Sequence, residues 1–124
     1  RVTRPLLVLG YPTMVDAAEA VPALLAVGPL VACEGLDARI VDLVRAGGGS
    51  VPDLPRGGGW LFVEYTDAGL EQALVAAGSA LEHRVVTDAR EAAALWRIRE
   101  DGAGLANRSS NKQTFPQYAA GTRS

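Results

Sequence analysis

Arg99 is the residue whose place in the sequence most clearly requires a chemical partner. At about 100° per residue along a helix, its side chain projects from the middle of an apolar face formed by Ala92, Leu95 and Trp96, whereas Arg97 points away. A guanidinium group is almost never buried without a partner. Three alternatives stay open. Arg99 pairs with a carboxylate of this domain, reaches solvent at the helix end, or lines a cleft that binds an anion bidentately.

Three other side chains could do chemistry. Cys33 lies on an apolar segment, where a free cysteine usually behaves as a small hydrophobic residue. His83 lies between two charged residues at the start of a predicted strand. A histidine in this position is more often a solvated edge residue than a catalytic base. Glu34 follows Cys33 at the predicted end of a strand, a position equally typical of a functional carboxylate and of a helix-entry residue. No nucleophile–base pair or metal cluster is visible, so we predict no catalytic residue and no metal ligand.

Two runs of three glycines, at 47–49 and 57–59, do not have the spacing of a phosphate-binding loop. A dinucleotide fingerprint that starts at Gly47 requires glycine where Pro52 stands, and one that starts at Gly57 meets Phe62. We therefore expect a surface loop here.

The elements that position these residues alternate between strands and helices. Apolar runs predict strands at 5–11, 30–33, 60–66 and 83–87, and helical spacing follows each of them. Capping signals stand at Thr13, Asp67 and Asp88, and the last helix is expected to end near Glu100. This order fits either a small parallel α/β sheet or a ferredoxin-like α+β layer pair.

The composition is that of one globular domain. The chain has 124 residues, 48% of them hydrophobic and 21% charged, with a net charge of −2. This charge gives no reason to expect nucleic acid or an anionic membrane as partner, and no apolar run of about 18 residues could span a bilayer. We expect a cytoplasmic domain. Because the chain begins on a strand and without methionine, we also expect a piece of a longer protein.

The last helix carries a motif. Its segment Leu-Trp-Arg-Ile-Arg-Glu, residues 95–100, resembles the Leu-Trp-x-x-Arg-Glu motif of the FAD-linked oxidases. In particular it is similar to the C-terminal or cap domain of the group of D-lactate dehydrogenase, the glycolate oxidase D subunit and D-2-hydroxyglutarate dehydrogenase. Segments 6–12, 32–37, 59–65 and 86–88 agree with the family in the same order. The resemblance covers about residues 2–106.

The resemblance implies an α+β fold, a ferredoxin-like antiparallel sheet with helices packed on one face. This cap domain would occupy residues 1–106, with an irregular or truncated tail at 107–124. FAD would be held by a separate FAD-binding domain of the same polypeptide, and the flavin would accept a hydride from a small 2-hydroxy acid. Arg99 would bind the substrate carboxylate, and Glu34 and Trp96 would face the cofactor.

By itself this chain is expected to hold no flavin and not to catalyse. A cap without its partner domain exposes the surface that covers the flavin, so self-association is expected. The alternative function is a stand-alone ferredoxin-like module that binds a small molecule or regulates another protein, with no connection to flavin.

Overall fold

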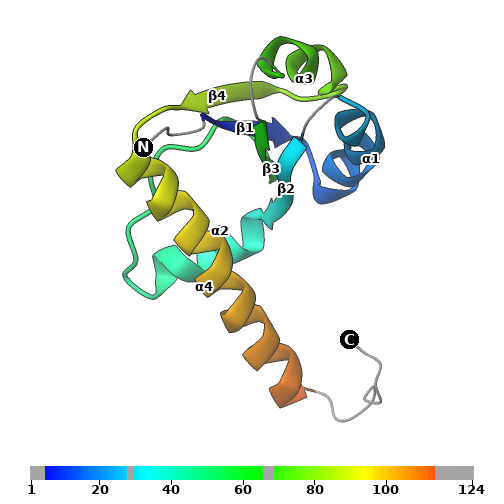
Figure 1. Cartoon of the computed structure of the whole chain (residues 1–124). Helices are drawn as coiled ribbons and strands as arrows, with labels where there is room; N and C mark the ends of the chain where they lie inside the picture. The colour runs from blue at the N-terminus through cyan, green and yellow to red at the C-terminus, as the bar shows by residue number, and fades with distance from the viewer. Residues whose placement is uncertain (1–4, 28–29, 66–68, 114–124) are drawn as a thin grey trace.

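The structure is a computed structural model that describes the backbone of residues 5–27, 30–65 and 69–113, and the side chains of 5–27, 31–65 and 69–102. Strands and helices alternate along the chain (Figure 1). The strands are β1 (Leu6–Tyr11), β2 (Leu30–Asp37), β3 (Gly59–Tyr65) and β4 (Glu82–Val86). The helices are α1 (Met14–Leu25), α2 (Ala38–Ala46), α3 (Leu70–Ala76) and α4 (Ala89–Gln113).

The sheet is antiparallel, with the strand order β2-β3-β1-β4. β3 lies between β1 and β2, and β1 lies between β3 and β4. The units β1-α1-β2 and β3-α3-β4 therefore each connect two strands across one intervening strand, as in a ferredoxin-like split βαβ fold. This order confirms the expected α+β class and excludes the parallel alternative.

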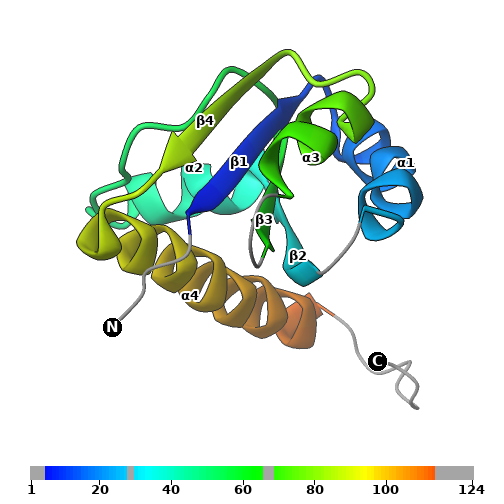
Figure 2. The same ribbon diagram turned by 45° about the horizontal axis from the view of Figure 1, so that its top comes forward.

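Helices cover both faces of the sheet, which corrects the expectation that they pack on one face. α1 and α3 lie on one side, and α2 and α4 lie on the other (Figure 2). The reason is visible in β1, which is buried along its whole length. Because successive side chains point to opposite faces, Leu7 and Leu9 need a cover on one side while Leu6 and Val8 need one on the other. In the ferredoxin-like unit α1 and α3 supply the first cover, and α2 and α4 add the second.

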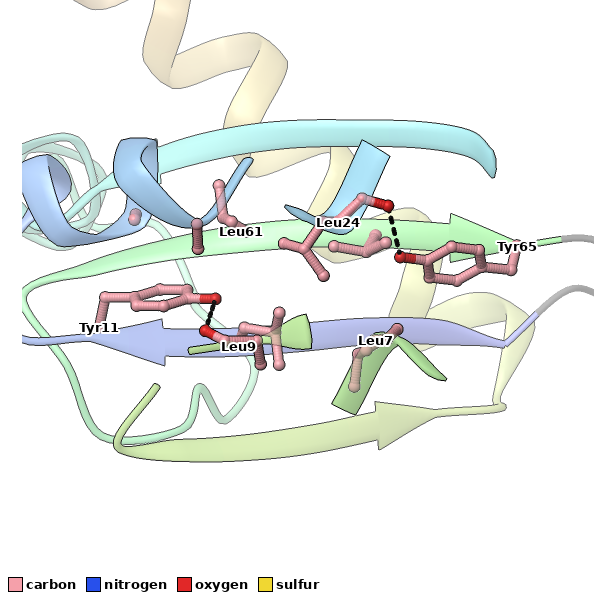
Figure 3. Close-up of a cluster of buried hydrophobic side chains, with 11 residues drawn as sticks. Leu7, Leu9, Tyr11, Leu24, Leu61 and Tyr65 are labelled. Carbon is pink, nitrogen blue, oxygen red and sulfur yellow. Dashed lines mark hydrogen bonds between the residues drawn. The ribbon is translucent and has the colours of Figure 1, made fainter. Parts of the chain in front are cut away.

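Two buried tyrosines join the helices α1 and α3 to the sheet (Figure 3). The Tyr11 hydroxyl at the end of β1 donates a hydrogen bond to the carbonyl of Ala77 at 2.7 Å. The Tyr65 hydroxyl at the end of β3 donates to the carbonyl of Leu24 at 3.5 Å. Burial raises the pKa of both phenols, that of Tyr11 to about 12, and charge on Cys33 adds to the effect.

The predicted helix starts agree with the structure where it describes them. Thr13 accepts a hydrogen bond from the backbone N–H of Asp16 at the start of α1, and Asp88 accepts one from the N–H of Arg90 at the start of α4. Asp67 lies outside the described residues. At the start of α2, Asp37 caps the N–H of Arg39, and its hydrogen bonds with that residue lower the pKa of its carboxyl group.

Two predicted ends were wrong. β2 continues through Glu34 to Asp37, so Glu34 lies within the strand and not after it. α4 continues beyond Glu100 to Gln113, so residues 107–113 are helical where an irregular tail was expected. Gly102 follows directly after the predicted end of this helix, and the structure gives this glycine another role. A Cβ there would collide with the Ile40 side chain, so this glycine instead allows α4 to approach α2 closely.

None of the helices in the described part of the chain is long and apolar enough to cross a membrane.

Candidate functional site

The candidate site lies where α4 crosses β2 and β3. In the sheet Glu34 of β2 is directly opposite Phe62 of β3, and Glu64 lies two residues further along β3 on the same face. Trp96 and Arg99 are three residues apart on α4 and thus neighbours on its surface. Both project toward these strands, because their hydrogen bonds end on β2 and β3.

Arg99 is bound by two successive residues of β2. Its Nη2 lies 3.0 Å from Oε1 of Glu34, and its Nε donates to the carbonyl oxygen of Gly35 at 3.1 Å. The pair is only partly buried, since 32% of the Arg99 side chain and 48% of the Glu34 side chain are exposed. A ligand from solvent can therefore reach both charged groups.

Trp96 makes a second connection one helical turn earlier. Its indole Nε1 donates to Oε2 of Glu64 at 3.1 Å. The Trp96 ring also stands edge-on to Phe62, with 5.3 Å between the ring centroids. Each carboxylate on this face of β2 and β3 is thus paired with a side chain of α4.

Arg99 lies at the edge of the buried side of α4 rather than at its centre. Among the residues of this helix up to 102, whose side chains the structure describes, the buried ones are Ala92, Leu95, Ile98 and Gly102. The apolar face predicted from the sequence includes Trp96 and omits Ile98, so it is rotated toward Arg99 relative to the buried side of α4. Of the three alternatives, the structure shows a carboxylate partner in the domain together with partial exposure to solvent.

Sequence reasoning missed two groups of this site. Glu64 is the single charged residue of β3, and a carboxylate within an apolar strand is a signal that could have found it. Gly35 contributes its backbone carbonyl, and no residue type at this position would have indicated that.

Cys33 and His83 are not brought together. They lie on β2 and β4, the two edge strands of the sheet. The Cys33 side chain points away from Glu34 and packs against the core under α1 and α3. Burial and the neighbouring Glu34 carboxylate raise the pKa of the Cys33 thiol, which favours the unreactive protonated form. His83 is exposed, as predicted.

The glycine runs do not fit a flavin pyrophosphate. The amides of Gly47, Gly48 and Gly49 donate to carbonyls at the end of α2, and the amide of Gly58 donates to the carbonyl of Tyr11. A pyrophosphate site needs backbone N–H groups that point at the ligand. The described glycine loops therefore do not fit this part of FAD. Across the part of the chain that the structure describes, no three His, Cys, Asp or Glu side chains cluster in a way that could hold a metal ion.

Together the fold and the site define an α+β domain that presents an arginine–carboxylate pair at the crossing of a helix and a sheet. Residues 2–117 match the family described as FAD linked oxidases, C-terminal domain, and the chain belongs to this family. No curated protein matches the chain. Membership confirms the predicted family. It implies FAD in the full-length oxidase and an FAD-binding domain as partner, and it favours the first predicted function over a module without flavin.

Proposed function

We infer that this domain is the substrate-binding cap of an FAD-dependent oxidoreductase that acts on a 2-hydroxy acid. Arg99 binds the carboxylate of the substrate. Glu34 and Trp96 lie on the side of the cap that faces the flavin. Redox chemistry belongs to the cofactor, and the cap orients the substrate and excludes water. The isolated chain does not catalyse.

The observation that supports this proposal is the state of the Arg99 guanidinium. It is fixed against β2 through Nε and Nη2, yet a third of the side chain is exposed. Exposed ion pairs contribute little to the free energy of folding. An arginine that served only to stabilise the fold would therefore contribute more if its ion pair were fully buried. Toward the residues that the structure describes, Nη1 of Arg99 donates no hydrogen bond, and a planar guanidinium with such N–H groups is well suited to a carboxylate.

Steady-state kinetics of the enzyme that contains its FAD-binding domain test the proposal. We expect Arg99→Lys to lower kcat/KM for the 2-hydroxy acid by about 30- to 1,000-fold, which corresponds to about 2–4 kcal/mol of lost transition-state binding. An ammonium group keeps the charge but cannot make the two parallel hydrogen bonds.

Arg97→Lys is the matched control, because Arg97 lies on the same helix and is exposed. It should leave kcat/KM within about twofold, as expected of a surface substitution. Equal effects of the two substitutions would refute the assignment of Arg99 to the substrate.

A further inference from the structure

The Arg99 guanidinium has two edges that can each serve a pair of acceptors, one formed by Nε and Nη2 and the other by Nη1 and Nη2. β2 occupies the first edge. The carbonyl of Gly35 accepts from Nε, and Glu34 accepts from Nη2. Because two successive residues of one strand supply both acceptors, they fix the plane of the guanidinium. Among the residues with described side chains, none accepts a hydrogen bond from Nη1.

The surroundings keep this geometry rigid. Glu34 lies within β2 and is directly opposite Phe62 of β3, so its backbone cannot shift without breaking the sheet. The hydrogen bond from Trp96 to Glu64 fixes α4 against β3 one turn before Arg99. A guanidinium that is already oriented loses less rotamer freedom when a ligand binds.

We propose that Glu34 is the positioning residue of the carboxylate site: it holds Nη2 of Arg99 beside the Gly35 carbonyl that binds Nε, so that the Nη1–Nη2 edge meets the substrate carboxylate. The inference rests on the proposed function. The alternative is a competing role for Glu34. In that case Glu34 occupies the place of the substrate carboxylate on Arg99 and must be displaced before the substrate binds.

Glu34→Gln and Glu34→Ala form a matched pair of variants. Both remove the same negative charge, but only glutamine keeps a side-chain oxygen that can accept from Nη2. A difference between them reports the lost acceptor and not the lost charge. Because almost half of the Glu34 side chain is exposed, neither substitution opens a cavity in the core. Thermal melts verify that both variants are folded.

The first arm of the experiment needs no ligand. In the ¹⁵N-labelled chain, the Nε–H signal of Arg99 is assigned by its loss in Arg99→Lys, and its exchange with water is measured. We expect Glu34→Ala to accelerate this exchange by about three- to fivefold. Without its partner at Nη2, the guanidinium more often leaves the plane in which Nε donates to the Gly35 carbonyl, and a partly exposed ion pair is worth about that factor. Glu34→Gln should restore slow exchange. Exchange in Glu34→Ala as slow as in the wild type would overturn the proposal.

The second arm titrates the same samples with glycolate and follows the Arg99 signal. We expect glycolate to bind Glu34→Gln about fivefold more tightly than Glu34→Ala, because only the first variant keeps Arg99 oriented. Equal affinity of the two variants, both tighter than the wild type, would show that Glu34 competes with the ligand, and would overturn the positioning role. If glycolate does not shift the Arg99 signal in any sample, the proposed function fails, while the first arm still decides whether Glu34 orients Arg99.

Discussion

Trp96 and Glu64 are joined by a hydrogen bond of 3.1 Å between the indole Nε1 and the carboxylate Oε2, and this bond ties α4 to β3. Glu64 is partly buried, and the strand around it is otherwise apolar. The bond therefore replaces hydration that the carboxylate gives up on folding. It also sets the register of α4 from which Arg99 reaches β2.

Loss of this bond should destabilise the domain. We expect Glu64→Ala to lower the free energy of unfolding by about 1–3 kcal/mol, because a part-buried indole N–H then lacks its acceptor. Glu64→Gln keeps an acceptor and should cost less than about 1 kcal/mol. Urea unfolding measures both, with Glu71→Ala on the exposed face of α3 as the control. Equal losses for alanine and glutamine would mean that the hydrogen bond is not the stabilising element.

Removal of the Arg99 side chain should hardly affect stability. The ion pair with Glu34 is partly exposed, and exposed pairs are worth about 0–1 kcal/mol. We expect Arg99→Ala to lower the Tm of the chain by at most about 4 °C. A drop of about 10 °C or more in a thermal melt would make Arg99 a structural residue.

Tyr11 makes the stability of the domain sensitive to alkaline pH. Burial and charge on Cys33 and Tyr65 raise its pKa from 10.0 to about 12 in the folded chain. The unfolded state therefore releases this proton first, and the free energy of unfolding falls as pH rises from 10 to 12. The loss should be on the order of 2 kcal/mol. Below pH 10 the contribution is complete.

The Tyr11→Phe variant isolates this effect. At pH 8 it should be about 1–3 kcal/mol less stable than the wild type, since the carbonyl of Ala77 loses its buried donor. Between pH 10 and 12 the difference should shrink, because phenylalanine has no proton to lose. Burial also raises the pKa of Tyr65, which both proteins contain. The free energy of unfolding of the variant should therefore still fall with pH over this range, but less steeply than that of the wild type. Parallel pH profiles of the two proteins would contradict the assignment.

Gly102 should resist substitution although alanine normally stabilises a helix. A Cβ at this position would overlap Cγ2 of Ile40, and the branched side chain has little freedom to move away. We expect Gly102→Ala to cost about 1–3 kcal/mol. A double-mutant cycle with Ile40→Ala checks the cause, since the cost of the added methyl group should disappear when its neighbour is removed. An additive cycle would place the effect elsewhere.

Much of the fold could be predicted from the sequence, because the apolar runs 5–11 and 60–66 match β1 and β3 closely. The direction of the strands could not. A sheet covered on both faces gives continuous apolar strands whether it is parallel or antiparallel, so the pattern alone left both arrangements open. The family resemblance favoured the antiparallel sheet but not the second pair of helices.

The site was predictable only in part. The spacing on α4 indicated that Arg99 needs a partner, but not which one, because Glu34 is 65 positions away along the chain and was assigned to a strand end. The rotation of α4 depends on the close approach of Gly102 to Ile40, and that contact exists only in the folded domain. Helical spacing alone therefore could not separate an arginine at the edge of the buried face from one at its centre.

The central claim is that Arg99 recognises the carboxylate of the substrate, and the direct measurement compares a 2-hydroxy acid with its neutral amide. In the enzyme that contains its FAD-binding domain, the ratio of kcat/KM for the acid to kcat/KM for the amide should be high in the wild type. It should fall about 30-fold or more in Arg99→Lys, because only the acid uses the paired hydrogen bonds. A ratio that is unchanged in Arg99→Lys, with both substrates slowed alike, would contradict the claim.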